Sequence, residues 1–519
     1  MQAALLIWVL LFAFVGARFA DYLNRILSPD MAAVAFAEGG DDAYYYFSVA
    51  RNIGKGLGAT IDGEHWTTGF QPLWQLLTGL SFIAGSDRAA FAIIYLLSFS
   101  CWAAGLFLFV RFVRRASPVP TTPLATALLA VLFLCEVQLN LNYFNGLDTG
   151  LYLTLCLALL TAFQHHLQSA PAIASPARLV GIGVLAGTFM LARNDGVFLC
   201  AALLSATLVR GARPRPFREG LIIVATASVL VVPWLIYCQV VWGYPMPQSG
   251  VATSTAIYGQ VPWQDILRYL VTSVVPTFFL KTRTFIDTLP LSVLVAAVIV
   301  ATVLATYWRS HDRSPAVERS SRLVLIALAG ACIMLVLYYS IVSSVGQFFV
   351  RYFVPIKLLV LILLSLFLLR AWQHLQRKRV ATAAIVCLSV AAIGSNLYWT
   401  LRDHDLPYRS YMGYEAYHFP RSPYGKGPTL VGTPESGRLG FLDPTRVINL
   451  DGKGRVDALR AMQNNTMDTF MKDAGFDYLL LTDFYVNRFD KLSPAWRKTF
   501  HQVDRLGIFN VYANAAKGH

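Results

Sequence analysis

The sequence predicts a polytopic α-helical membrane protein that ends in a small α/β domain. Of its 519 residues, 56% are hydrophobic and only 14% are charged, whereas about 25% of the residues in a soluble domain are charged. Several uninterrupted apolar runs reach the length of about 20 residues that crosses about 30 Å of hydrocarbon. A β-barrel would instead show short segments of alternating polarity, so the chain belongs to the helical class.

Eleven apolar segments are interpreted as membrane spans. They are residues 4–20, 89–110, 122–140, 147–163, 179–192, 197–210, 220–241, 288–308, 322–343, 354–370 and 380–399. A further apolar segment, Leu73–Ala84, has only about a dozen residues, which is short for a crossing. We interpret it as an interfacial or half-inserted helix, and counts of twelve or thirteen spans stay open because of it.

The distribution of basic residues predicts the orientation of the chain in the membrane. The loops 111–115, 210–218, 309–322 and 370–379 are rich in arginine and lysine and fall on one side of the predicted bundle. The positive-inside rule identifies that side as cytoplasmic, which also gives a cytoplasmic N-terminus. These loops account for the net charge of +14. Since there is no basic helix or aromatic stacking motif, binding of nucleic acid is not predicted.

The composition changes at about residue 400 and divides the chain into two predicted domains. Residues 1–400 form a transmembrane module, and residues 401–519 form an extracytoplasmic α/β domain. In the second domain, short β-like runs alternate with helix-like stretches. The runs are Thr429–Gly432, Arg446–Leu450, Tyr478–Thr482 and Phe509–Tyr512, and the stretches are Val456–Met462 and Thr466–Ala474.

The first outer loop, at about 28–71, contains the leading candidates for catalysis. Asp41 and Asp42 are adjacent and close to the membrane surface, where desolvation of a carboxylate is costly. The segment Ala43–Ile53 is predicted to form an amphipathic helix that lies along the interface with its aromatic side toward the lipid. The alternative is that Asp41 or Asp42 simply caps this helix.

Other residues of this loop suit a sugar, because carboxylates bind hydroxyl groups and aromatic rings cover the C–H faces of a sugar. The candidates for substrate binding are Tyr44, Tyr45, His65, Trp66 and Gln71. His65 has no second ligand at a useful spacing, so no metal site is assigned to it.

Later outer segments supply the remaining candidates. Asp148 begins a predicted span and Asp195 lies in a tight turn, so helix capping and turn formation are the alternatives to sugar binding. Gln248 follows two prolines at the membrane rim. Lys281, Arg283 and Arg351, which precedes Tyr352, are cations at the outer face that suit a lipid phosphate, and snorkelling to lipid headgroups is their alternative.

Taken in order, these motifs resemble the GT-C superfamily of integral-membrane glycosyltransferases, which use polyprenyl-phosphate-linked sugars. The resemblance rests on Asp41-Asp42, Thr68-Gly69-Phe70-Gln71-Pro72, Gly146-Leu147-Asp148-Thr149, Arg193-Asn194-Asp195-Gly196, Pro245-Met246-Pro247-Gln248-Ser249 and Arg351-Tyr352. It is strongest toward the bacterial branch with arabinofuranosyl-, aminoarabinosyl- and protein mannosyltransferases. One departure is Asn194, where many relatives have proline, and it leaves the role of Asp195 in question.

The resemblance implies an inverting hexosyl- or pentosyltransferase of the bacterial inner membrane. An aspartate of the first outer loop, Asp41 or Asp42, would act as general base on an acceptor hydroxyl, which attacks the sugar and releases polyprenyl phosphate. Arg351, with Lys281 or Arg283, would stabilise the leaving phosphate, and Asp148 would bind hydroxyls. The acceptor would be a glycan, a lipid or a protein. Some relatives use Mg²⁺, Mn²⁺ or Ca²⁺ and others none, and the spacing of the carboxylates does not decide between them.

Two alternative functions are considered from the sequence. A transporter or flippase for lipid or sugar would show internal repeats and ionisable groups at mid-membrane depth, and the sequence has neither feature. A non-catalytic scaffold would use the C-terminal domain to bind a partner, and that domain carries no motif that identifies one.

Overall fold

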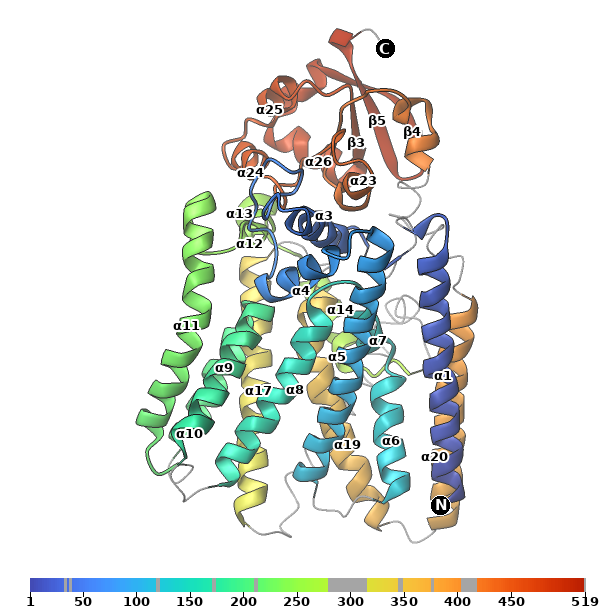
Figure 1. Cartoon of the computed structure of the whole chain (residues 1–519), viewed down its shortest axis with the longest axis vertical. Coiled ribbons are helices and arrows are strands. Elements are labelled where there is room, and N and C mark those ends of the chain that lie inside the picture. Colours follow the sequence, from blue (N-terminus) through green and yellow to red (C-terminus); the bar gives the residue numbers. More distant parts are fainter. Residues whose placement is uncertain are drawn as a thin grey trace.

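The computed structural model in Figure 1 consists of a long helical bundle with a sheet-containing domain at one end. It describes residues 1–31, 35–36, 40–117, 122–169, 174–209, 213–278, 315–343, 349–374, 378–402 and 418–517. The N-terminus lies at the end of the bundle that is farthest from the sheet domain (Figure 1).

Seven helices of the described residues are long and apolar enough to cross a membrane. They are α1 (Gln2–Leu27), α5 (Asp87–Ala116), α8 (Thr149–Gln168), α11 (Pro216–Trp242), α17 (Pro315–Val342), α19 (Val354–His374) and α20 (Lys378–Arg402). The pair α6 (Pro123–Leu134) and α7 (Val137–Phe144) is apolar enough for one further span, bent by 63°. α9 (Pro176–Ala192) and α10 (Gly196–Leu208) are shorter apolar helices.

Ten of the predicted spans coincide with these helices. The predicted span 288–308 lies outside the described residues, so the total of eleven stays a prediction. The short apolar segment that was expected to be interfacial forms α4 (Pro72–Phe82). α4 begins at a proline, whose fixed φ and missing N–H suit the first turn of a helix.

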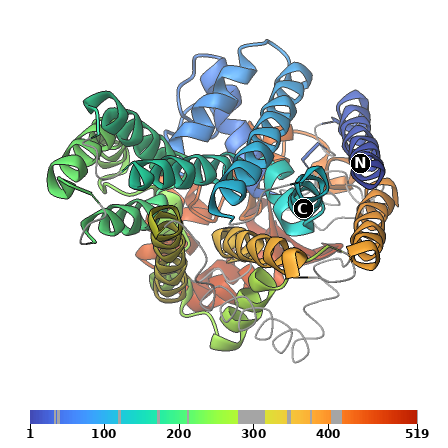
Figure 2. The same ribbon diagram turned by 90° about the horizontal axis from the view of Figure 1, so that it is seen from below.

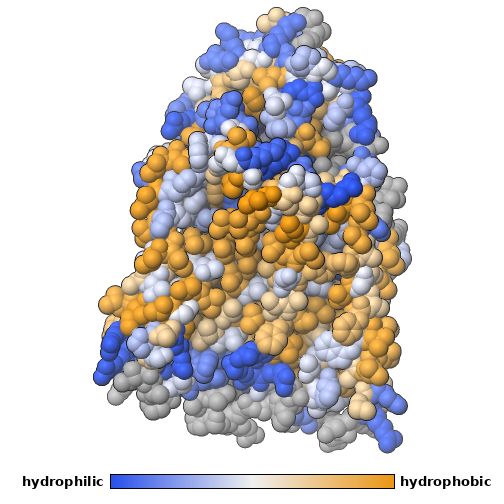
Figure 3. All heavy atoms as spheres, viewed as in Figure 1, coloured by the Kyte–Doolittle hydropathy of each residue, from blue (hydrophilic) through white to orange (hydrophobic). Residues whose placement is uncertain are grey.

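The surface of the bundle has the polarity expected of a protein that lies in a bilayer. Figure 3 shows an apolar band on the face in view, between a polar sheet domain and a polar lower end. Large apolar side chains are exposed on several helices, among them Phe12, Phe107 and Val229, which are 72%, 61% and 72% exposed. Seen from below in Figure 2, α9, α10 and α11 form a lobe on one side, and α1 and α20 pack together on the other. This band is where lipid would contact the protein.

The bend between α6 and α7 contains a buried ion pair that the sequence did not reveal. Glu136 and Lys357 are fully buried, and Lys357 Nζ lies 3.4 Å from Glu136 Oε1. Glu136 Oε2 accepts a 2.6 Å hydrogen bond from Leu139 N and so caps α7. Lys357 Nζ also donates to the carbonyl of Thr272, at 2.8 Å, on α14 (Trp263–Val274). Because every partner is satisfied, the pair fixes α14 against the bundle instead of destabilising it.

The C-terminal domain is built on a five-stranded mixed sheet with the order β2-β1-β3-β5-β4. Its strands are β1 (Val431–Thr433), β2 (Val447–Asn449), β3 (Tyr478–Thr482), β4 (Phe500–Leu506) and β5 (Phe509–Asn514). β1 is parallel to β2 and β3, whereas β5 is antiparallel to β3 and β4. The helices that connect the strands are α23 (Gly437–Leu442), α24 (Val456–Gln463), α25 (Met467–Asp473) and α26 (Asp483–Leu492).

The helix after the aspartate pair, α3 (Asp42–Gly54), lies between the bundle and the sheet domain (Figure 1). Its predicted helical conformation is confirmed, but the expectation that its aromatic side faces lipid is wrong. Tyr44, Tyr45 and Tyr46 are all buried, and α3 packs on α4 from one side and on α23 from the other. The aromatic rings of α3 are therefore covered by protein instead of lipid, and the C-terminal domain packs directly on α3.

Substitution of Gly437 by alanine is expected to weaken this docking. A Cβ at Gly437 would lie 2.9 Å from the carboxylate carbon of Asp41 and would overlap its carbonyl oxygen. Overpacking of this kind costs about 1–3 kcal/mol, so the melting temperature of the detergent-solubilised protein should fall. Gly440, in the same short helix, is the control, because its Cβ would meet nothing closer than Val447 at 3.9 Å. Gly440→Ala should keep or raise the melting temperature, and equal losses in both variants would contradict a steric origin.

Candidate active site

A cavity of about 370 Å³ opens between the bundle and the C-terminal domain. Pockets of about 300–1,000 Å³ are the usual size of small-molecule sites. The N-terminal ends of α3, α8 and α10 meet here, because Asp42, Asp148 and Asp195 all line the cavity and lie at those ends. Helix N-termini carry a partial positive charge that favours anions. The three aspartates and an anionic ligand would therefore both be attracted to this part of the cavity.

Asp42 is the carboxylate that lies between two cations. Its Oδ1 is 3.2 Å from Lys453 Nζ, and its Oδ2 is 3.4 Å from Arg351 Nη1. Burial alone would raise the pKa of Asp42, but the charges of Lys453 and Arg351 outweigh burial and hold the pKa below its ordinary value. Asp42 is therefore ionised at neutral pH and able to accept a proton or a hydrogen bond.

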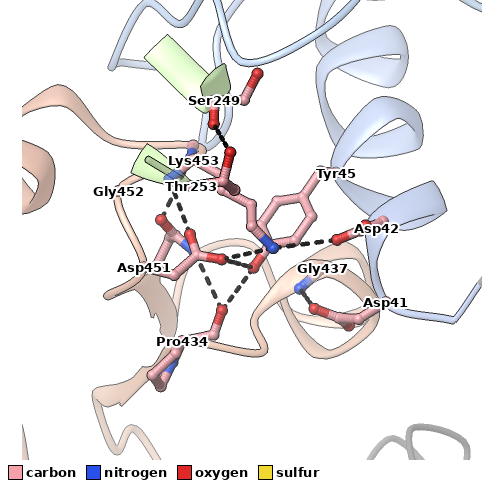
Figure 4. Close-up of polar contacts among 12 residues, drawn as sticks. Asp41, Asp42, Tyr45, Ser249, Thr253, Pro434, Gly437, Asp451, Gly452 and Lys453 are labelled. Atoms are coloured by element: carbon pink, nitrogen blue, oxygen red, sulfur yellow. Dashed lines mark hydrogen bonds and ion pairs between the residues drawn. The ribbon is translucent and has the colours of Figure 1, made fainter. Parts of the chain in front are cut away.

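Asp41 points away from this cavity and toward the C-terminal domain (Figure 4). Its Oδ2 and Oδ1 accept hydrogen bonds from the backbone N–H groups of Gly437 and Arg438, at 2.7 and 2.6 Å. Burial raises the pKa of Asp41 to about 6, although these two hydrogen bonds and the Arg438 charge lower it. Asp41 occupies the N-cap position of α3, but its side chain accepts no hydrogen bond from the helix, so the capping alternative does not explain its side chain.

The same interface contains Glu435, whose neutral form is favoured. Burial and then the neighbouring Asp41 raise the pKa of Glu435 to about 8. A carboxyl group whose folded-state pKa is raised contributes stability that is complete below its unfolded pKa and is lost as the pH rises through the folded value. Between pH 6.5 and 9 the wild-type melting temperature should therefore fall more than that of Glu435→Gln. Parallel curves for the two proteins would contradict this assignment.

Arg193 connects the remaining two carboxylates of the cavity. Its guanidinium forms an ion pair with Asp195, and its Nε lies 3.7 Å from Asp148 Oδ2. Arg193 Nη1 also donates to the carbonyl of Arg351, at 3.3 Å. Neither Asp148 nor Asp195 makes a side-chain hydrogen bond as a helix cap, so both side chains are directed to partners around the cavity.

Asp195 retains one oxygen for a ligand. Its Oδ2 accepts a 2.8 Å hydrogen bond from the hydroxyl of Tyr339, whereas its Oδ1 is buried and has no hydrogen-bond partner among the described residues. The ring of Tyr339 stacks on that of Tyr352 with centroids 4.2 Å apart, and the Tyr352 hydroxyl accepts a 3.2 Å hydrogen bond from Arg351 Nη2. A buried acceptor without a donor is costly, and a hydroxyl of a bound molecule would satisfy it.

Tyrosines from α3 hold the upper wall of the cavity in place. The Tyr46 hydroxyl donates to Asp148 Oδ1 at 3.2 Å and accepts from Gln71 N at 3.0 Å. The Tyr45 hydroxyl donates to the carbonyl of Pro434 at 2.7 Å and accepts from Asn449 Nδ2 at 3.0 Å. α3 therefore ties the cavity to both halves of the protein.

Lys453, in a loop of the C-terminal domain, also lines the cavity, and Figure 4 shows it beside Asp451 and Gly452 of the same loop. Gln248, at the start of α12 (Gln248–Ala252), fixes this loop from below: its Nε2 donates to the carbonyls of Gly452 and Lys453, at 3.3 and 3.0 Å. Its Oε1 accepts from Thr68 N at 3.2 Å. Gly69 is required here because a Cβ at that position would overlap the carbonyl oxygen of Lys453.

The structure brings together most, but not all, of the residues predicted from the sequence. Asp42, Tyr45, Gln71, Asp148, Asp195, Arg351 and Tyr352 line the cavity, and Gln248 braces it. Asp41 and Tyr44 are buried in the interface behind it. His65 and Trp66 are not among its lining residues: His65 pairs with Asp62 at 2.8 Å, and Trp66 is 52% exposed. Lys281 and Arg283 lie outside the described residues.

The carboxylates are not arranged as a divalent-cation site. Each of Asp41, Asp42, Asp148 and Asp195 has a cationic or N–H partner on at least one oxygen. Among the described residues, no group of three or more His, Cys, Asp or Glu side chains has the arrangement of a metal site. Hard cations need several converging oxygens, and the carboxylates of the described residues alone do not supply such a set for Mg²⁺, Mn²⁺ or Ca²⁺.

Among the lining residues that were not predicted, three contact the carboxylates of the cavity through a charge or a hydroxyl: Arg193, Tyr339 and Lys453. Arg193 is two residues from the predicted candidate Asp195, and its position in the turn before α10 could have identified it. Tyr339 lies within a long apolar span, where a tyrosine gives no sign of its partner. Lys453 is separated from Asp42 by 411 residues, and no local pattern relates them.

The other half of the cavity is apolar and opens along the bundle. Met190, Val197, Phe198, Val231, Leu235 and Val342 line it. Phe198 and Val197 belong to α10, and Leu235 belongs to α11, so this half of the cavity lies between helices of the bundle. A ligand with a charged end and a hydrocarbon part would match both halves.

No protein-family model matches the chain, and no curated protein sequence is significantly similar to it. Solved structures do match it over nearly its whole length. ArnT from Cupriavidus metallidurans, bound to undecaprenyl phosphate, shares 14% identity with a TM-score of 0.55, and the match covers 98% of each chain. Archaeal oligosaccharyltransferase AglB from Archaeoglobus fulgidus, in complex with an inhibitory peptide and a dolichol-phosphate, shares 14% identity with a TM-score of 0.52. That match covers 99% of this chain and 75% of AglB.

A second structure of the Archaeoglobus fulgidus oligosaccharyltransferase, tethered to an acceptor peptide, gives a TM-score of 0.52 at 13% identity. It is covered over 74% of its length, and this chain over 98%. ArnT and AglB both belong to the GT-C superfamily. The chain is thus a multi-pass helical membrane protein with a small C-terminal sheet domain, and its fold is the GT-C fold.

Proposed function

We propose that the protein is an inverting glycosyltransferase that moves a sugar from a polyprenyl-phosphate donor to an acceptor hydroxyl. The observation that carries the proposal is the cavity itself, which joins a charged end to an apolar end. Asp42, Arg193, Arg351 and Lys453 line the first, and side chains of α10 and α11 line the second. Of the proteins with this fold, ArnT was solved with undecaprenyl phosphate and AglB with a dolichol-phosphate. Both ligands combine a phosphate with a long hydrocarbon chain.

In the proposed reaction Asp42 is the general base. It accepts the proton of the acceptor hydroxyl while that oxygen forms a bond to the anomeric carbon. The bond from the anomeric carbon to the phosphate oxygen breaks at the same time, and its electron pair leaves with polyprenyl phosphate. Of the two candidate aspartates, Asp42 is favoured because it lines the cavity, whereas both oxygens of Asp41 accept backbone hydrogen bonds. A base must be within hydrogen-bond reach of the proton that it removes.

The other side chains have distinct proposed roles. Arg351 stabilises the charge that develops on the leaving phosphate, because a guanidinium binds phosphate oxygens through fixed N–H groups. Asp148 and the unpaired oxygen of Asp195 accept hydrogen bonds from hydroxyls of the sugar or of the acceptor. Tyr352 orients Arg351. The apolar half of the cavity takes the first isoprene units of the donor.

The orientation and location of the protein belong to the same proposal. The last turn of α5 contains Arg114 and Arg115, and this end of α5 lies at the end of the bundle that is farthest from the sheet domain (Figure 1). This supports a cytoplasmic N-terminus and an extracytoplasmic domain at 401–519. The cavity then faces the outer side of a bacterial inner membrane. The sugar, whether hexose or pentose, and the acceptor, whether glycan, lipid or protein, are to be identified by experiment.

The test uses the purified full-length protein in liposomes or detergent. It is incubated with a panel of polyprenyl-phosphate sugars and acceptors, and the released polyprenyl phosphate is measured. Release that depends on both donor and acceptor is the expected result. A protein that moves labelled lipid or sugar across liposomes but releases no polyprenyl phosphate would be a transporter or flippase, and one that does neither would be a scaffold.

A further inference from the structure

Resting on the proposed function, we propose that Lys453 is a positioning residue for Asp42, and that the C-terminal domain is therefore part of the catalytic unit. The alternative is that the C-terminal domain only selects the acceptor and takes no part in catalysis. Lys453 argues against this view, since it is the point at which the domain enters the cavity and contacts the proposed base.

The backbone of Lys453 is held rigidly at the cavity. Its carbonyl accepts a 3.0 Å hydrogen bond from Gln248 Nε2, which belongs to the transmembrane module. The N–H of Lys453 donates to Asp451 Oδ1 at 2.9 Å. The carbonyl of Lys453 packs so closely on Gly69 that any side chain at position 69 would overlap it. A lysine that was merely an exposed loop residue would not need contacts from two other segments.

The side chain of Lys453 lies between two carboxylates (Figure 4). Its Nζ is 3.2 Å from Asp42 Oδ1 and 3.2 Å from Asp451 Oδ2. Its Nζ also lies 5.7 Å from the centroid of the Tyr45 ring. Asp451 is itself held by Asn449 Nδ2 at 2.8 Å. The ammonium group is therefore fixed by the C-terminal domain and presented to the first outer loop.

Several other charged groups face Asp42, and they act on its ionisation in opposite directions: cations favour the ionised form and carboxylates oppose it. Arg351 from α18 (Phe349–Tyr352) is the second cation. Asp41 and the Glu435 carboxyl group act on the same cluster from α3 and from the C-terminal domain. The charges of Lys453 and then Arg351 hold the pKa of Asp42 below its ordinary value, against the effect of burial. Loss of Lys453 should therefore raise the pKa at which Asp42 loses its negative charge.

The experiment compares the pH dependence of kcat/KM in the wild type, Lys453→Met and Lys453→Arg. The acidic limb is the part of the profile in which kcat/KM rises as Asp42 loses its proton. In Lys453→Met this limb should move upward by about one pH unit or more, since an opposite charge at this distance lowers a carboxyl pKa by about 1–3 units. Lys453→Arg keeps the charge and should restore the limb. Lys472→Met removes an exposed lysine of the same domain and is the matched control.

Each outcome decides the inference. A shifted limb in Lys453→Met, or an inactive Lys453→Met with an active Lys453→Arg, supports it. An unshifted limb in an active Lys453→Met would overturn it, and so would loss of activity in folded Lys453→Arg, because the charge is then not what matters. Asp42→Asn separates this from the proposed function: if that variant retains wild-type activity, the proposed base is wrong whatever Lys453 does.

Discussion

Asp42→Asn is expected to lower kcat by about 10²–10⁴-fold, the usual contribution of a general base. The asparagine has nearly the same size and keeps one acceptor oxygen, so the ion pairs of Lys453 and Arg351 weaken but the cavity is retained. The measurement is the release of polyprenyl phosphate under saturating donor and acceptor, alongside the melting temperature. Binding of the donor should change far less than kcat.

Asp41→Asn is the matched control for this prediction. It leaves one backbone N–H of Gly437 or Arg438 without its acceptor, which costs about 1–3 kcal/mol of stability. It should therefore lower the melting temperature while keeping most of kcat at a temperature where the variant is folded. If Asp41→Asn loses catalysis and Asp42→Asn keeps it, the two roles have to be exchanged.

Arg351→Met should lower kcat by about 10²–10³-fold, as loss of one preorganised donor to a developing charge does in other enzymes. The same change should weaken inhibition by free polyprenyl phosphate, because the product carries the phosphate that Arg351 is proposed to bind. Arg268→Met is the control, since Arg268 is 43% exposed and pairs only at the surface with Asp265. An Arg351→Met variant that is inhibited as strongly as the wild type would show that the arginine only holds Asp42.

Much of the fold was readable from the sequence, because long apolar runs follow directly from the thickness of the bilayer. The parts that were missed depend on contacts between distant segments. β4 (Phe500–Leu506) is an edge strand whose residues are mostly exposed, so it lacks the apolar alternation that marks a half-buried strand. α3 was expected to face lipid because its aromatic stripe has the same pattern whether lipid or the C-terminal domain covers it.

The candidate site was predictable to a similar degree. Asp42, Asp148 and Asp195 each stand at the start of a helix, and the sequence marks such positions by a polar residue before an apolar run. The sequence does not say which of these starts meet in space, or that Arg193 lies among them. Asp41 and Asp42 were equivalent in sequence, and only the direction of each side chain separates them: Asp41 faces α23 and Asp42 faces the cavity.

The pairing of Asp42 with Lys453 has a consequence for how the protein comes into being. The second of these residues is made 411 residues after the first. A nascent chain that has inserted all its helices still lacks the lysine until the final segment has been exported and has settled on α3. Under the proposal, Asp42 of a newly made molecule is therefore positioned and held ionised by Lys453 only after the segment that carries the lysine has been made and exported.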